Sequence, residues 1–163
     1  MQCPVCRQDQ IIVEVQGVEL DLCPEGHGFW FDADELRQLF DAAGVGEAAQ
    51  PLDLREAAQP LDLRDAARGL EERLASLPQE RARPARRCPR CRRRMVHVRA
   101  SGHPAPVILD RCPRGHGLWF DQGELEQLLA SELAGQDVLL ARVKEFLAQF
   151  TRPFRGSPGR ETS

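Results

Sequence analysis

The stretch LDLCPEGHGFWFD at residues 20–32 recurs as LDRCPRGHGLWFD at residues 109–121. Upstream of each stretch lies a Cys-Pro-x-Cys segment, CPVC at residues 3–6 and CPRC at residues 88–91. Matched residues are 85 positions apart in the first segment and 89 apart in the second. The chain therefore contains an internal duplication, and positions held in both copies mark what one structural unit needs.

The duplication defines two sets of metal ligands. All six cysteines fall at matched positions, and of the four histidines only His27 and His116 do so. His97 and His103 have no counterpart in the first copy, so they are poor ligand candidates. Structural zinc takes four Cys or His ligands in a tetrahedron, and either imidazole nitrogen could serve. We predict two Zn²⁺ ions per chain, the first held by Cys3, Cys6, Cys23 and His27 and the second by Cys88, Cys91, Cys112 and His116.

Each copy is predicted to be a zinc ribbon, a β-hairpin whose ends carry two ligand-bearing turns, here called knuckles. Apolar residues alternate over 11–15 and 18–22 around a glycine, which is typical of a hairpin. Residues 95–99 and 107–111 take the same places in the second copy. Glycines on both sides of each ligand histidine let the backbone turn closely around the metal. A copy of roughly 45 residues buries little core, so zinc is expected to supply much of its folding energy.

A helix is predicted to follow the second knuckle of each copy. Asp32 and Glu35, like Asp121 and Glu124, have the spacing of a capping box. This interpretation is preferred to a catalytic role for the two aspartates. The tryptophan two positions before each aspartate is expected to be a core residue of its copy and not a platform for a nucleobase.

The predicted fold class is a small, metal-stabilised α+β fold with two zinc-ribbon lobes plus linker and C-terminal helices. In the linker, EAAQPLDLR at residues 47–55 is repeated at residues 56–64. Leu70, Leu74 and Leu77 then recur at helical spacing, which predicts a short amphipathic helix lying on the ribbons. The predicted segments are an acidic ribbon at 1–43, the linker at 44–85, a basic ribbon at 86–133, a helix at 134–150 and a disordered tail at 151–163.

The hydropathy of the chain and the number of its cysteines bear on the cellular compartment in which we expect the protein. The 163-residue chain has no apolar run near the roughly 18 residues that a membrane span needs. Its first residues lack the basic-then-apolar pattern of a secretory signal. Three cysteines per copy cannot all pair within that copy, which favours metal-bound thiolates over disulfides. We therefore expect a cytoplasmic protein with no membrane association.

At these motifs the sequence resembles the bacterial zinc-ribbon family named for transcription factor IIB, the transcription-factor zinc-finger domain. The family pattern runs Cys-Pro-x-Cys, a hairpin, then Cys-Pro-x-Cys-Gly-Gly-x-Trp-Leu-Asp and a Glu-Leu helix start. The pattern is present twice, over roughly residues 1–42 and 86–130, with a Gly-His pair where the family usually has Cys-Gly. The resemblance implies zinc binding, and it implies a role in transcription only through the family's name.

Charge divides the two copies and suggests a first function. Residues 1–50 hold two Arg and ten Asp or Glu, a net charge of −8, whereas residues 81–120 hold eleven Arg and one acid, a net charge of +10. Such a basic surface can neutralise phosphates, so we predict a nucleic-acid-binding or transcription-associated module; a solvated charged face explains the arginines equally well. The candidate contacts are Arg86, Arg87, Arg90, Arg92, Arg93 and Arg94.

The same asymmetry supports an alternative, a protein-interaction scaffold. The acidic and basic copies could dock on each other within one chain or between chains, which would make a homo-oligomer. An acidic protein surface is then a candidate partner. No phosphate loop, catalytic triad or unassigned cysteine nucleophile occurs in the sequence, and four ligands per zinc leave no open position. We therefore expect no enzymatic activity and no small-molecule substrate.

Overall fold

The structure, a computed structural model, describes residues 1–33, 35–45, 63–80, 83–101, 105–135 and 137–151. The tandem repeat of the linker lies almost entirely outside these residues, as does the tail that was predicted to be disordered. In chain order the elements are β1 (Ile11–Val15), β2 (Val18–Leu22), β3 (Gly28–Asp32), α1 (Glu35–Val45), α2 (Leu63–Ser76), β4 (Gln79–Glu80), β5 (Val96–Ala100), β6 (Val107–Arg111), β7 (Gly117–Asp121), α3 (Glu124–Glu132) and α4 (Asp137–Thr151).

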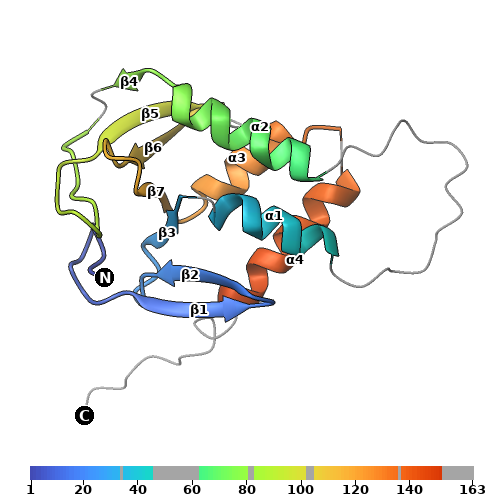
Figure 1. Cartoon of the computed structure of the whole chain (residues 1–163), viewed down its shortest axis with the longest axis horizontal. Coiled ribbons are helices and arrows are strands. Elements are labelled where there is room, and N and C mark those ends of the chain that lie inside the picture. Colours follow the sequence, from blue (N-terminus) through green and yellow to red (C-terminus); the bar gives the residue numbers. More distant parts are fainter. Residues whose placement is uncertain (34, 46–62, 81–82, 102–104, 136, 152–163) are drawn as a thin grey trace, which may run out of the picture.

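The two copies share a single sheet. In the part of the chain that the structure describes, seven strands pair antiparallel in the order β1-β2-β3-β7-β6-β5-β4. The copies meet at the centre, where β3 pairs with β7 (Figure 1). Trp30 lies opposite Trp119 in this ladder, and Gly28 lies opposite Asp121. The pairing of Gly28 with Asp121 is repeated by that of Gly117 with Asp32, so the two copies are related by an approximate twofold axis through the tryptophan pair.

The strands β3 and β7 were not predicted, because the sequence pattern there indicates only a knuckle and a helix start. Glycines make their pairing possible. A Cβ at Gly28 would lie 2.0 Å from the carbonyl oxygen of Phe120, and one at Gly117 would lie 2.0 Å from that of Phe31. Both glycines also have a positive φ, 151° and 149°. They serve the close approach of the two strands, a role different from the predicted turn around the metal.

The two faces of the sheet bury different groups because side chains alternate along each strand. Phe29 and Phe31 point to the face covered by helices, whereas Trp30 points to the other face, together with the zinc-ligand cysteines. In Figure 1 the helices gather on one side of the molecule, and the knuckle segments, including the N-terminus, lie on the other. Phe31 and Phe120 meet edge to face at 5.4 Å between ring centroids, which ties the two copies together within the helix-covered core.

The helices confirm the predicted α+β class. Leu36 and Leu39 of α1 are buried in the helix-covered core, as are Leu125, Leu128 and Leu129 of α3. The predicted linker helix is α2, and its Leu70 and Leu74 lie in the same core, as expected for a helix lying on the ribbons. No helix among the described residues is long and apolar enough to cross a membrane.

Candidate metal centres and the surface between them

Each copy brings its four predicted ligands together. The ligand atoms of Cys3, Cys6, Cys23 and His27 all lie within 4.8 Å of one another. In this first centre the Cys6 and Cys23 sulfurs are 3.6 Å apart, and the Cys23 sulfur lies 3.2 Å from His27 Nδ1. The first pair of ligands lies on a turn before β1, and the second pair on the turn between β2 and β3.

The second centre repeats this geometry. Cys88, Cys91, Cys112 and His116 also have ligand atoms within 4.8 Å of one another. The Cys91 and Cys112 sulfurs are 3.7 Å apart, and His116 Nδ1 lies 3.5 Å from the Cys112 sulfur. Nδ1 is therefore the imidazole nitrogen that faces the thiols in both copies.

These distances fit tetrahedral zinc. With Zn–S near 2.3 Å and Zn–N near 2.0–2.1 Å, a tetrahedron places two sulfurs roughly 3.8 Å apart and a sulfur and a nitrogen roughly 3.6 Å apart. All six cysteines lie within the described residues, and each is free of a disulfide. Three thiolates and one imidazole are a ligand set that structural Zn²⁺ prefers. The residues present thus fit two zinc ions per chain, one at each centre.

The thiols themselves need a cation. Burial raises the pKa of Cys3 and of Cys88 to about 12. The more exposed Cys91 differs, because a hydrogen bond from the Arg93 backbone lowers its pKa to about 7. Two buried thiols would therefore stay protonated at neutral pH without a metal, and Zn²⁺ supplies the positive charge that holds them as thiolates.

The two centres are connected through the tryptophan pair. Trp30 and Trp119 have no exposed surface and lie in one buried cluster with cysteines of both centres. This confirms the predicted core role of the tryptophans. The backbone links the centres too: the Ala33 amide donates to the His116 carbonyl at 3.1 Å, and the Gln122 amide donates to the His27 carbonyl at 3.0 Å. Each ligand histidine is thus held by the residue that follows the central strand of the other copy.

The predicted capping role is wrong for the Asp121 side chain, since no side-chain hydrogen bond caps α3, and the Asp32 side chain has the same kind of indole partner as Asp121. Asp32 Oδ1 accepts from the Trp30 indole N–H at 2.7 Å, and Asp121 Oδ1 accepts from that of Trp119 at 2.7 Å. The aspartates end β3 and β7, so their side chains share the tryptophan face of the sheet. The other half of the capping box does form, since a Glu35 carboxylate oxygen accepts from the Asp32 amide at 2.7 Å.

A buried polar network fills the same face of the second copy. Asp110 is fully buried, accepts from Arg83 at 2.7 Å and from Arg86 at 3.2 Å, and lies 3.2 Å from His97 Nε2. His97 is outside both metal clusters, as predicted, and His103 lies outside the described residues. Burial opposes ionisation of Asp121, but hydrogen bonds from Arg86 and the Trp119 indole lower the pKa of this carboxyl.

The six predicted nucleic-acid contacts divide into two groups. Arg86 is half-buried and pairs with Asp110 and Asp121, and Arg90 pairs with Asp32 of the first copy. The remaining four are exposed, and no carboxylate among the described residues pairs with them. This second group consists of Arg87, Arg92, Arg93 and Arg94.

A basic cavity of about 610 Å³ opens between the first knuckles of the two copies. Among the described residues that line it, none is acidic. The lining residues are Gln2, Cys3, Pro4, Arg7, Ala85, Arg86, Arg87, Cys88, Pro89, Arg92 and Arg94. Arg7 and Gln2 were not among the predicted contacts, although Arg7 stands at the position matched to Arg92.

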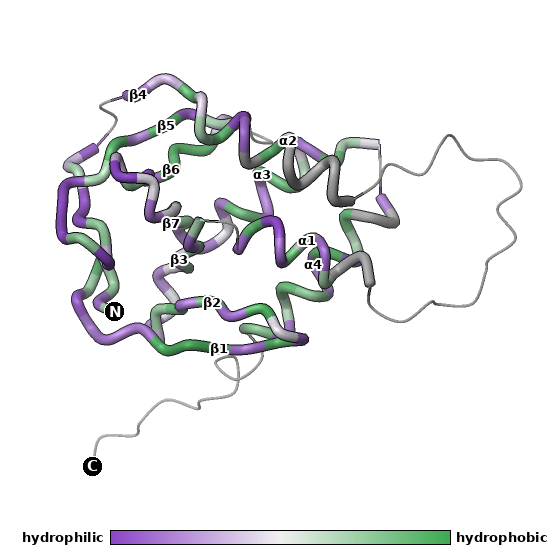
Figure 2. The backbone as a smooth tube through the Cα atoms, in the orientation of Figure 1, coloured by the Kyte–Doolittle hydropathy of each residue, from purple (hydrophilic) through white to green (hydrophobic). Residues whose placement is uncertain are grey.

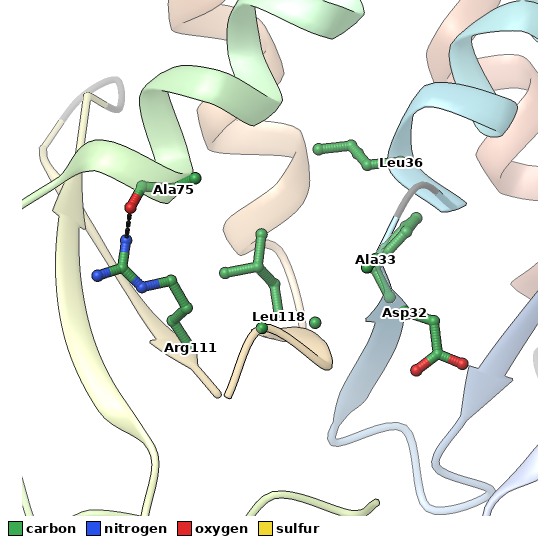
Figure 3. A pocket seen from close by; sticks show the side chains of 9 residues that line it. Asp32, Ala33, Leu36, Ala75, Arg111 and Leu118 are labelled. Carbon is green, nitrogen blue, oxygen red and sulfur yellow. Dashed lines mark hydrogen bonds between the residues drawn. The ribbon is translucent and has the colours of Figure 1, made fainter. Parts of the chain in front are cut away.

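A second, apolar cavity of about 210 Å³ lies on the helix-covered side. Figure 3 shows it between the end of α2, the start of α1 and Leu118 of β7. Arg111 donates there to the Leu74 carbonyl at 2.7 Å and to the Ala75 carbonyl at 2.5 Å, so a positive charge meets the C-terminal end of α2. Because the matched position in the first copy is Leu22, this attachment of α2 belongs to the second copy alone.

Two antiparallel ribbons, each with a Cys₃His centre at its knuckles, define a zinc-ribbon protein. Residues 2–42 and 87–131 match the family model described as transcription factor zinc-finger, the zinc ribbon of the transcription factor IIB type. The chain belongs to this family, with two copies of the domain. Neither the curated proteins nor the solved structures compared with the chain show a significant match.

Proposed function

We propose that this zinc-ribbon protein binds nucleic acid through the arginine surface of its second copy. The supporting observation is the group of four exposed arginines at and beside the first knuckle of that copy, Arg87, Arg92, Arg93 and Arg94, which lack a carboxylate partner among the described residues. Guanidinium groups bind phosphates through paired hydrogen bonds, and each phosphate contact releases counterions. Because both tryptophans are buried, neither offers a ring for base stacking, and binding through phosphates is expected to tolerate many sequences.

Fluorescence anisotropy with labelled DNA and RNA over a salt series tests this proposal. Affinity is expected to fall steeply as salt rises, with a slope that becomes shallower in Arg93→Ala plus Arg94→Ala. Arg114→Ala plus Arg142→Ala removes the same charge from exposed positions elsewhere and serves as the control. Absence of binding at low salt, or equal losses in the two double variants, would contradict a dedicated arginine surface.

The alternative is a scaffold in which the acidic copy occupies the basic one. The ion pair between Arg90 and Asp32 favours it, because it joins the two copies directly. Deleting residues 1–50 would also remove β1 to β3, so a point substitution is the sharper test. Asp32→Asn keeps an acceptor for the Trp30 indole but releases the Arg90 charge. If the acidic copy masks the arginine surface, this variant binds nucleic acid more tightly; unchanged affinity would argue against masking.

We infer further that the protein is not an enzyme. Catalytic zinc usually has three protein ligands and keeps one position open for water. Each cluster here offers three thiols and one imidazole within bonding reach of one ion, which supports closed, structural centres. Cobalt substitution tests this inference, since four-coordinate thiolate sites have intense visible absorption. A spectrum of a water-bearing, open site would contradict it.

A further inference from the structure

The basic cavity lies on the approximate twofold axis between the copies. Its lining contains matched pairs from the two first knuckles: Cys3 with Cys88, Pro4 with Pro89, Gln2 with Arg87, and Arg7 with Arg92. In Figure 1 the N-terminal segment and the segment leading into β5 lie together on the side away from the helices. In Figure 2 the segment leading into β5 contains several strongly hydrophilic stretches. A single copy provides only half of this cavity.

The charge of the cavity suits an anion. The arginines that line it are Arg7, Arg86, Arg87, Arg92 and Arg94. Each Zn²⁺ with three thiolates and one neutral imidazole carries a single net negative charge, so the two zinc centres offset only part of this positive charge. Arg92 donates to the neutral Gln2 side chain at 2.6 Å, and Arg87 donates to the Arg92 carbonyl at 3.0 Å. These bonds orient the guanidinium groups without cancelling their charge. Only Arg86, among the described lining arginines, pairs with carboxylates.

Backbone conformation singles out two of these arginines. Arg7 and Arg92 have φ angles of 66° and 62°, in the left-handed region that disfavours residues with a Cβ. Glycine would adopt this conformation without strain. The same strained residue type therefore occupies the same place in both copies, and both side chains line one cavity. Strain of this kind, held where charged side chains converge, indicates a binding role.

We propose that this cavity binds the backbone phosphates of a nucleic acid strand, with Arg7 and Arg92 as a matched pair of contacts, one from each copy. This inference rests on the proposed nucleic-acid function and names the part of the surface that carries it. Phosphate is the expected anion because planar guanidinium groups approaching from two sides can each donate two hydrogen bonds to its oxygens. The strand crosses the seam between the copies, so both knuckles contribute to one site.

The decisive variant is Arg7→Gly plus Arg92→Gly. Glycine relieves the strained backbone, so thermal stability is expected to stay unchanged or rise, whereas a merely structural role for the arginines predicts a loss. Affinity for a short labelled single-stranded DNA is expected to fall by roughly tenfold or more. The salt slope is expected to drop by about 0.7 for each lost contact. Arg114→Ala plus Arg142→Ala again controls for net charge, and it is expected to change affinity much less.

A second variant, Gln2→Glu, keeps the acceptor for Arg92 and adds a negative charge to the cavity, so it is also expected to weaken binding. Unchanged affinity in both cavity variants, with wild-type binding intact, would overturn the cavity assignment and leave the proposed function standing. If the wild-type protein binds no nucleic acid at low salt, the proposed function fails first. Binding of inorganic pyrophosphate alone, without DNA or RNA, would overturn the strand as the occupant.

Discussion

A methyl group at Gly28 is expected to break the seam between the two copies. In Gly28→Ala the new Cβ would lie 2.0 Å from the Phe120 carbonyl oxygen and 3.0 Å from the Asp121 Cα, both backbone atoms of the paired strand. Because these atoms belong to the backbone, the steric clash is relieved only if β3 and β7 separate. Overpacking costs about 1–3 kcal/mol, and a side chain at a φ of 151° adds about 1–3 kcal/mol. We expect a total loss of about 2–6 kcal/mol, a large part of the about 5–15 kcal/mol that stabilises most domains.

The expected loss extends to both zinc centres. Opening the seam removes the hydrogen bonds from Gln122 to the His27 carbonyl and from Ala33 to the His116 carbonyl. Gly28→Ala is therefore expected to release both zinc ions at lower chelator concentration than wild type, and to unfold at lower denaturant concentration.

Gly123→Ala is the matched control for the substitution at the seam. Gly123 has a φ of 86°, and a Cβ there would meet no atom within 4 Å. It is expected to cost only roughly 1–2 kcal/mol and to leave zinc affinity unchanged. If Gly28→Ala unfolds no more readily than this control, or weakens only the zinc centre of the first copy, the close approach of β3 and β7 does not stabilise both centres.

Three further perturbations test the energetics. Complete zinc removal is expected to abolish native circular dichroism, since structural zinc contributes on the order of 10–16 kcal/mol; a retained native spectrum would contradict this. Burial raises the pKa of Glu35 to about 7, so the folded state favours the protonated carboxyl. The free energy of unfolding therefore falls as pH rises from about 4.5, the ordinary pKa, to about 7. In urea titrations of the zinc-saturated protein, Glu35→Gln should therefore have a free energy of unfolding about 1–2 kcal/mol above wild type near pH 8, a value reduced for solvent at this half-buried site. Near pH 5 the difference should be small. An equal difference at both pH values would contradict this. Asp110→Asn removes the buried partner of Arg83 and Arg86 and should cost about 2–4 kcal/mol, whereas the matched Asp21→Asn should cost little; equal losses would argue against the network.

The zinc ligands and hairpins could be predicted because their signals are local. Two cysteines on one turn, alternation over residues 11–15 and 18–22, and the duplication each limit the choice of ligand and strand without knowledge of the fold. The pairing of β3 with β7 could not be predicted, because GFWFD lacks the alternation of polar and apolar residues that marks a strand and its partner lies 89 positions away. The duplication shows that the two segments correspond, but correspondence does not reveal that they pair.

The role of Asp32 shows how one spacing can serve two structures. Three positions separate Asp32 from Glu35, which fits a capping box, and the Glu35 half of that box forms. Two positions separate Trp30 from Asp32, which fits two neighbours on one face of a strand. Once β3 forms, the Trp30 indole N–H donates a hydrogen bond to the Asp32 carboxylate, because a buried N–H without an acceptor costs about 1–3 kcal/mol. The strand therefore decides how the aspartate is used, and the strand depends on the second copy.

The net charge of each copy also gave no indication of the basic cavity between the copies. Residues 1–50 are strongly acidic, so their net charge does not predict that Arg7 belongs to a basic surface. Once the copies share a sheet, Arg7 lies beside the arginines at the first knuckle of the second copy, so the net charge of one copy does not describe the charge of this surface. Each copy alone would expose β3 or β7 as an unpaired apolar edge and would carry half of the cavity. Binding measurements on isolated copies would therefore report the loss of the seam, so the proposed site must be tested by point substitutions in the intact chain.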